Sequence, residues 1–168
     1  MADEEKYSGG FPPIVGKASR VLVLGSLPGV RSIEAAEYYA HPRNAFWRIM
    51  AELCGAKGSY KQRCAALELH GIAVWDVLAR SIRSGSLDAN IDMKSAKIND
   101  FNHFLGRHKT IERICFNGQK AAKIFTSDAF YAELEARYEF RTLPSTSPAH
   151  AAMSFDEKLA RWRSGIGL

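Results

Sequence analysis

Short apolar runs alternate along the chain with amphipathic segments, and this alternation predicts the fold. The runs are rich in β-branched or aromatic residues and have the length of strands: 21–24, 72–75, 114–116 and 140–143. Continuous apolar strands are typical of a parallel sheet that is covered on both faces. Apolar residues with helical spacing occur in four further segments: 46–54, 98–105, 121–125 and 155–162. We therefore expect an α/β fold in which helices pack on both sides of a parallel sheet.

Glycines and polar residues mark where helices should begin and end. Gly55 and Gly106 each follow a helical segment at a position typical of a C-cap. Ser154 precedes the last helical segment, with Glu157 at the spacing of a capping box. Residues 81–95 show neither periodicity and are expected to form the longest loop.

The N-terminal residues are expected to be separate from the main domain. Residues 1–19 are expected to form an N-terminal arm that packs on the domain. Within it, residues 8–10 are expected to be flexible, whereas residues 11–14 would dock as an extended apolar strip. Residues 20–168 are expected to form a single domain.

Composition and charge narrow the class of protein. The chain has 168 residues, of which 46% are hydrophobic and 24% charged, as is usual for a globular domain. No apolar run approaches the roughly 20 residues of a membrane span, and the first ten residues lack a signal-peptide pattern. We therefore expect a cytoplasmic protein, associated with the nucleoid if the source is prokaryotic. The formal net charge of +5 suits a polyanionic partner.

The cysteines argue against a bound metal. Cys54, Cys64 and Cys115 are odd in number and none has C-x-x-C spacing. A disulfide framework and a zinc or iron–sulfur site are therefore not expected. We expect the protein to work without a metal or another cofactor.

Polar or glycine-rich residues follow each of the predicted strands. They occupy positions 25–29, 76, 117–118 and 144–148. Because the carboxyl ends of parallel strands meet at one edge of the sheet, these residues should border a common crevice. Strand ends are polar in many α/β proteins, so the prediction rests on the convergence of all four.

Each segment near this edge allows a functional and a plain structural interpretation. The N–H groups of residues 25–29 could face an anion or a carbonyl oxygen, or the segment could be an ordinary turn. Asn44 could hold a water molecule or simply cap the following helix, and Tyr39 could stack on a base. Residues 144–148 could bind phosphates or form a rigid connection, and His150 could contact DNA or face solvent.

Taken together, these segments resemble the uracil-DNA glycosylase superfamily, and within it the hypoxanthine-DNA (deoxyinosine) glycosylases. Five segments carry the resemblance in order: VLVLGSLPG (21–29), YYAHPRNAFW (38–47), GIAVWDVLARSIRSGSLDANI (71–91), ICFNGQKAAKIF (114–125) and LPSTSPAHA (143–151). The resemblance implies a three-layer α/β/α sandwich around a short, mostly parallel four-stranded sheet. It also implies hydrolysis of the N-glycosidic bond of a deaminated base, hypoxanthine or uracil, in DNA, without a lyase step. Such a base must first leave the helix, which costs least when it is mispaired.

The resemblance assigns roles to individual residues. Asn44 would position the attacking water, because Leu27 stands where many members carry Asp or Asn and cannot orient water. The N–H groups of Ser26 and Leu27 would stabilise the departing base. Tyr39 would stack on that base, and Asp76 would accept a hydrogen bond from its ring N–H. A further group would hold the DNA backbone: Arg43, Ser145, Thr146, Ser147 and His150.

Two departures from the family pattern bear on the substrate. Leu143 stands where uracil-specific members have a histidine that supports the departing base, which disfavours efficient uracil removal. His150 stands where the hypoxanthine branch is expected to have an asparagine.

The expected partner is DNA that contains deaminated bases, with no membrane and no obligatory protein partner, and the chain is expected to be a monomer. Two alternatives stay open at this stage: a nonenzymatic α/β module that binds nucleotides or nucleic acid, and a small-molecule hydrolase. Release of a base from labelled DNA duplexes would separate the three.

Overall fold

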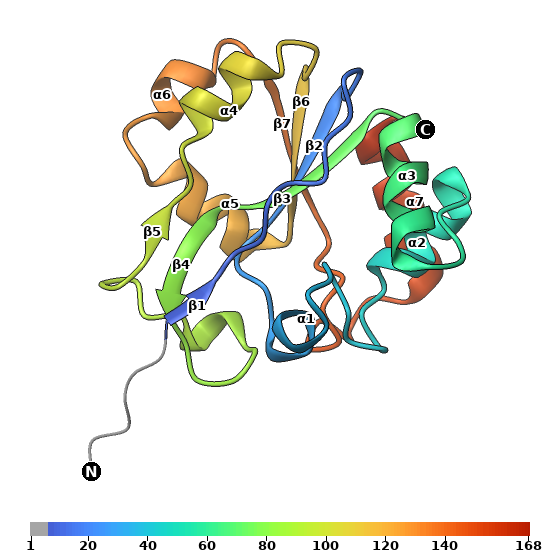
Figure 1. The fold of residues 1–168 in the computed structure, drawn as a ribbon, viewed down its shortest axis with the longest axis horizontal. Helices are drawn as coiled ribbons and strands as arrows, with labels where there is room; N and C mark the ends of the chain where they lie inside the picture. The colour runs from blue at the N-terminus through green and yellow to red at the C-terminus, as the bar shows by residue number, and fades with distance from the viewer. Residues whose placement is uncertain (1–6) are drawn as a thin grey trace.

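A parallel sheet lies at the centre of the computed structural model, which describes residues 7–168 (Figure 1). Its strands are β2 (Val21–Gly25), β3 (Ile72–Asp76), β6 (Arg113–Asn117) and β7 (Glu139–Leu143). They pair in the order β3-β2-β6-β7, and all three pairings are parallel. The four apolar runs in the sequence therefore predicted this sheet correctly. Every residue of the central strand β2 is buried.

Helices cover both faces of the sheet (Figure 1). One face carries α4 (Phe101–Arg107) and α5 (Gln119–Thr126), and the other carries α2 (Phe46–Cys54), α3 (Tyr60–Leu69) and α7 (Phe155–Ile166). Shorter elements complete the chain: α1 (Val30–Ala35), the 3₁₀ turn η1 (Asp88–Asn90) and α6 (Tyr131–Leu134). The architecture is the predicted three-layer α/β/α sandwich.

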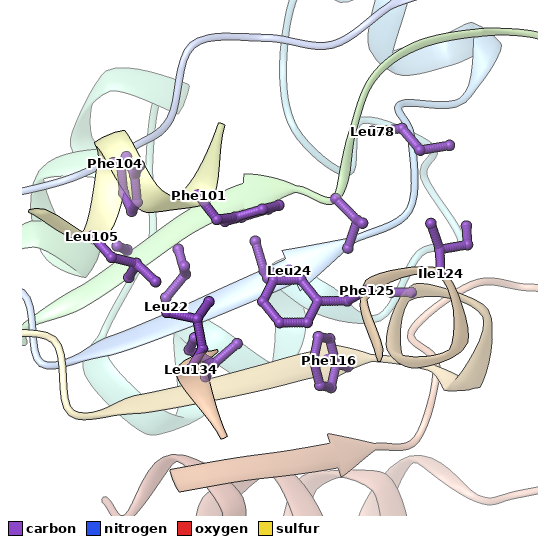
Figure 2. Close-up of a cluster of buried hydrophobic side chains, with 14 of the residues drawn as sticks. Leu22, Leu24, Leu78, Phe101, Phe104, Leu105, Phe116, Ile124, Phe125 and Leu134 are labelled. Atoms are coloured by element: carbon purple, nitrogen blue, oxygen red, sulfur yellow. The ribbon is translucent and has the colours of Figure 1, made fainter. Parts of the chain in front are cut away.

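Each face of the sheet has its own hydrophobic core, because side chains alternate along a strand. On one face, Leu22, Leu24 and Phe116 pack against Phe101 and Phe125 (Figure 2). The residues between them point to the other face, where the core includes Val23, Phe46, Ile49 and Trp162. Each buried side chain of this size contributes roughly 1.5–3 kcal/mol, so the two cores hold the sheet rigidly.

A second, antiparallel sheet was not predicted from the sequence. It consists of β1 (Tyr7–Gly9), β4 (Leu78–Ile82) and β5 (Lys97–Ile98). The expectation that residues 8–10 are flexible was therefore wrong: β1 pairs with β4, and the Gly10 N–H donates to the Ala79 carbonyl at 2.8 Å. These strands have two to five residues and no regular apolar alternation, so the hydrophobic pattern of the sequence did not predict them. For the same reason, the predicted loop 81–95 begins two residues too early, because β4 extends to Ile82.

One predicted helix has different ends. Ile98 belongs to β5, and the helix begins only after Asp100, whose side chain accepts a hydrogen bond from the His103 N–H. Gly106 lies inside α4 and does not end it. By contrast, Gly55 ends α2 in the left-handed conformation, and the Ser154 capping box begins α7, both as predicted.

The segment before β2 lies along the edge strand β3. The Ile14 N–H and carbonyl both bond to Val74, at 2.9 and 2.8 Å. The Tyr38 hydroxyl donates to the Pro12 carbonyl at 3.0 Å, and the Trp75 indole N–H donates to the Phe11 carbonyl at 3.1 Å. The bonds with Val74 and Trp75 tie the segment to β3, the strand that ends in Asp76.

Candidate active site at the carboxyl edge of the sheet

A cavity of about 650 Å³ lies where the strands of the parallel sheet end. Its walls come from the ends of β2, β3 and β6 and from the segments 38–44 and 145–150. The convergence predicted from the four polar strand ends is therefore confirmed. Small-molecule sites commonly have about 300–1,000 Å³, so this space is large enough for a small organic ligand.

Gly25 lets two polar side chains approach the end of β2. Asp76 lies beside Gly25 on the neighbouring strand. A Cβ atom at Gly25 would lie 2.7 Å from Asp76 Oδ1 and 3.0 Å from the Tyr39 hydroxyl. The first distance is shorter than real Cβ contacts, so any other residue here would displace the carboxyl group. Glycine at position 25 therefore allows the Asp76 carboxyl group and the Tyr39 hydroxyl to pack against the end of β2.

Two buried polar atoms of the cavity wall have no partner. Asp76 is 3% exposed, and neither its Oδ2 nor the Tyr39 hydroxyl is hydrogen-bonded to another group in residues 7–168. Leaving such an atom unpaired costs roughly 1–3 kcal/mol. A ligand with a polar edge would supply the missing hydrogen bonds.

Asp76 is poised to exist in both protonation states near neutral pH. Burial raises the pKa of its carboxyl group to about 7, with Arg83 lowering and Asp88 raising the pKa to smaller extents. In the charged form the group only accepts hydrogen bonds, whereas the neutral acid also donates one. Both forms can pair with the edge of a heterocyclic base.

Tyr39 is held in an unusual backbone conformation. Its φ is +53°, in the left-handed region that costs an ordinary residue about 1–2 kcal/mol. One face of its ring stacks on Phe46, with ring centroids 4.2 Å apart. Tyr39 is half-buried and lines the cavity, so the cavity-facing part of the ring is available to a planar ligand.

Asn44 bonds to the start of α2 and lines the cavity at the same time. The N-cap itself is Ala45. Asn44 Oδ1 accepts a hydrogen bond from the Phe46 N–H at 3.0 Å, at the start of α2. Two backbone bonds fix its position: Asn44 N–H to the His41 carbonyl, and Ala45 N–H to the Thr146 carbonyl, each 2.9 Å. A carboxamide oxygen has two lone pairs, so Oδ1 can bind a water molecule in addition to the Phe46 N–H.

The loop after β2 offers free backbone donors to the cavity. The N–H groups of Ser26 and Leu27 donate to no other group in the described part of the chain. The Leu27 side chain is 6% exposed and packs in the core, so only its backbone can serve a ligand. The Ser26 hydroxyl donates to Asp88 Oδ1 at 2.5 Å.

The loop 144–148 is clamped from inside the protein. Asn117 Nδ2 donates to Thr146 Oγ1 at 2.8 Å, and the Thr146 N–H donates back to Asn117 Oδ1 at 2.9 Å. Thr146 is only 1% exposed, so its hydroxyl supports the loop and is not presented at the surface for a phosphate. The hydroxyls of Ser145 and Ser147 each accept from an N–H group two residues later, which stiffens the loop.

Basic side chains surround the cavity mouth. Arg43 and His150, both predicted to contact DNA, are exposed and line it, and Lys120 lines it as well. Leu143 does not line this cavity; it is 6% exposed in the core beside α7. No titratable side chain therefore stands at position 143 to support a departing base.

Sequence reasoning missed three residues that build the site. Asn117 was noted only as a polar strand end, because its partner Thr146 is 29 positions away. Arg83 and Asp88 lie in what the sequence predicts as a loop, and no local pattern distinguishes them from solvent-exposed charges. Their roles depend on contacts with residues 26–28, which only the fold brings near.

Over residues 7–168, no group of three His, Cys, Asp or Glu side chains is arranged to hold a metal ion. In the same part of the chain, no helix combines the length and apolar character needed to cross a bilayer.

Comparisons with known proteins converge on one family. The model of the uracil DNA glycosylase superfamily matches residues 12–164. A hypoxanthine DNA glycosylase from Methanosarcina acetivorans is 34% identical over 150 residues, covering 86% of this chain and 89% of that protein. A hypoxanthine DNA glycosylase from Methanosarcina barkeri is 36% identical over 117 residues, covering 68% of this chain and 73% of that protein. The solution structure of a provisionally named uracil DNA glycosylase from M. acetivorans superposes with a TM-score of 0.79 at 31% identity, covering 96% and 97% of the two chains.

Proposed function

The chain belongs to the uracil DNA glycosylase superfamily and is a DNA glycosylase, and from this premise we propose that it removes hypoxanthine from DNA by simple hydrolysis. The observation that carries the proposal is the buried Asp76 carboxyl group, whose Oδ2 lacks a partner at the wall of the cavity. Beside it lie the Tyr39 ring, the free N–H groups of Ser26 and Leu27, and the carboxamide of Asn44.

The proposed reaction divides the work among these groups. The N-glycosidic bond breaks first, and the base leaves with the electron pair of that bond. Water then adds to C1′ of the cationic deoxyribose and loses a proton to solvent, while the departed base takes up a proton from solvent. Asn44 Oδ1 accepts a hydrogen bond from the water and orients it; a neutral amide is too weak a base to remove its proton early, so the sugar becomes cationic first. The N–H groups of Ser26 and Leu27 stabilise the negative charge on the departing base, an effect worth about 3 kcal/mol per donor.

Asp76 is proposed to read the base. As a carboxylate it accepts a hydrogen bond from N1–H of hypoxanthine, and as the neutral acid it also donates one to a ring or carbonyl acceptor. Adenine has no hydrogen on N1, so the carboxylate form discriminates against the undamaged base. Uracil offers a similar N3–H, but Leu143 supplies no group to support its departure.

The substrate can be identified by incubating the protein with labelled duplexes that contain one hypoxanthine, uracil or xanthine, or only normal bases. We expect abasic sites from the hypoxanthine duplex at the highest rate, and strand breaks only after treatment with alkali. Release of uracil alone would contradict the proposed specificity, and no release from any duplex would contradict the proposed activity.

The absence of a lyase step needs its own test, because Lys120 lines the cavity. A lysine that attacked C1′ would form an imine that borohydride converts into a stable link to DNA. We expect no such link during hypoxanthine release. A borohydride-dependent cross-link that is lost in Lys120→Met would overturn the hydrolytic proposal.

The base-reading role is tested by Asp76→Asn, which replaces the carboxyl group by an amide of similar shape. We expect the ratio of the hypoxanthine rate to the uracil rate to fall about tenfold or more, because an amide pairs well with uracil. An unchanged ratio would refute the role of Asp76 in selecting the base.

A further inference from the structure

Arg83 is a buried arginine that holds the loop after β2 from behind. It follows β4 directly, and its side chain is 1% exposed. Its Nη1 donates to the Leu27 carbonyl at 3.4 Å, and its Nη2 donates to the Pro28 carbonyl. The loop residues line the cavity, whereas Arg83 does not, so the guanidinium group binds the loop on the side away from the ligand space.

These two bonds orient the peptides that follow Leu27 and Pro28. The two preceding peptides, which carry the Ser26 and Leu27 N–H groups, are held separately, because the Gly25 and Ser26 carbonyls accept from the Val77 and Leu78 N–H groups at 2.8 and 3.0 Å. In a trans peptide the C=O and N–H groups point in opposite directions, and no described peptide is cis. Because the Pro28 carbonyl points at Arg83, the Gly29 N–H points the other way, and it has no partner in the described chain. Pro28 has no N–H group, so the peptide between Leu27 and Pro28 could present only a carbonyl oxygen, and Arg83 also binds that oxygen.

Charge pairing offsets only part of the cost of burying this arginine. Burial lowers the pKa of its guanidinium group, whereas the carboxylates of Asp88 and Asp76 raise it to smaller extents. The carboxylate of Asp88 is 3.7 Å away and also accepts from Ser26, while Arg83 Nε has no partner. Burying a cation in this way costs several kcal/mol unless the charge is fully compensated. A role in the chemistry would account for its presence.

We propose that Arg83 is a positioning residue for departure of the base: it keeps the carbonyl oxygens of Leu27 and Pro28 turned away from the cavity, so that only N–H groups face the leaving base. This inference rests on the proposed glycosylase reaction. The base leaves as an anion when the N-glycosidic bond breaks, and a carbonyl oxygen in the cavity would repel that charge. The positive charge behind the loop adds to the attraction without contacting the substrate.

The inference is tested by Arg83→Met, which keeps much of the side-chain length and removes both hydrogen bonds and the charge. Arg80→Met is the matched control, because Arg80 is exposed on the same strand and does not line the cavity. In single-turnover release of hypoxanthine from a duplex, we expect Arg83→Met to be about 10²-fold slower than the native protein and Arg80→Met to stay within about twofold. Binding to a duplex with 2′-fluoro-deoxyinosine, which resists cleavage, should change less than about threefold in both variants.

A second substrate separates a positioning role from a merely structural one. N7-methylated hypoxanthine leaves DNA as a neutral base and needs no stabilisation as an anion. We therefore expect Arg83→Met to slow its release by less than about fivefold. Equal losses with both substrates would overturn the proposal, because a damaged loop would slow them alike.

Arg83→Lys covers the case in which the methionine variant does not fold. Lysine keeps the charge but cannot hold two carbonyl groups with one planar fork. We expect a loss of about tenfold for hypoxanthine and a smaller loss for the N7-methylated base; a native rate for both would overturn the proposal. If the native protein releases no base at all, the proposed function fails. If the native protein is active and Arg83→Met behaves like Arg80→Met, only the role of Arg83 fails.

Discussion

At the residue scale, the site depends on a glycine that makes room for a carboxyl group. Gly25 allows Asp76 Oδ1 and the Tyr39 hydroxyl to lie against the end of β2. Sequence patterns placed Gly25, Asp76 and Asn44 at the correct edge of the sheet, because strand ends are readable from apolar runs. They could not show that Asp76 is unpaired or that Asn44 bonds to Phe46, since both facts depend on side-chain geometry.

Gly25→Ala should impair catalysis more than folding. The added methyl group would displace the Asp76 carboxyl and the Tyr39 ring, so we expect hypoxanthine release to slow by at least about 10²-fold. Gly106→Ala is the control, because a Cβ there meets nothing within 4 Å and alanine favours the helix. Single-turnover rates and thermal unfolding of both variants check this; a native rate in Gly25→Ala would show that the close approach is unimportant.

Asp76 should make the protein less stable as the pH rises toward neutrality. Its pKa is about 7 in the folded protein, against 3.8 as the ordinary value, so the folded state binds more protons between these values. Stability is therefore lost as the pH rises to about 7, and the loss then levels off. In Asp76→Asn this loss is absent.

The quantity to compare is the free energy of unfolding of Asp76→Asn minus that of the native protein. We expect this difference to increase by roughly 1–3 kcal/mol from pH 5 to pH 7 and to stay level from pH 7 to pH 8. Urea unfolding at each pH measures it. A difference that does not vary with pH would show that Asp76 titrates normally in the folded protein.

At the element scale, the loop 144–148 is a rigid part of the wall because β6 and α7 hold it. Asn117 at the end of β6 bonds to Thr146, the Trp162 indole N–H of α7 donates to the Pro144 carbonyl at 2.9 Å, and Lys158 Nζ donates to the His150 carbonyl at 2.6 Å. The sequence predicted both the loop and α7. It could not predict that they meet, because these contacts join residues far apart in the chain or on opposite sides of a turn.

Thr146→Val should loosen this loop. Valine has the shape of threonine but leaves buried Asn117 Nδ2 without its acceptor, so we expect a loss of about 1–3 kcal/mol in stability and weaker binding to DNA. Thr126→Val is the control, because the Thr126 hydroxyl is exposed at the end of α5 and bonds only to its own helix. Urea unfolding and titration with a labelled duplex test both variants; equal stability of the two would contradict the proposed clamp.

At the scale of the whole molecule, the residues proposed to act on the substrate all lie at one edge of the parallel sheet. Apolar runs and capping signals predicted this layered architecture well, because each is a local pattern. The antiparallel sheet of β1, β4 and β5 was not predicted, because its strands are short and pair with segments that are distant in the sequence. That sheet matters for the site, since β4 leads directly into Arg83.

Binding to DNA should weaken steeply with salt if the basic mouth of the cavity contacts phosphates. For Arg43→Met we expect the slope of log affinity against log salt to become shallower by about 0.9, the amount for one lost phosphate contact. Arg20→Met is the control, because Arg20 lies before β2, at the opposite edge of the sheet, and pairs with Glu112 at 2.8 Å. Equal slopes for the two variants would place the bound DNA elsewhere.

The most direct test of the account is the rate at which Asn44→Ala releases hypoxanthine from a duplex in a single turnover. Asn44 also bonds to the first N–H of α2, so Ser59→Ala serves as the control: it removes the cap of α3, which does not line the cavity, at a cost of about 1 kcal/mol. We predict that Asn44→Ala slows release by at least about 10²-fold while Ser59→Ala keeps the native rate. If Asn44→Ala is as fast as Ser59→Ala, Asn44 only supports the start of α2, and another group must hold the attacking water.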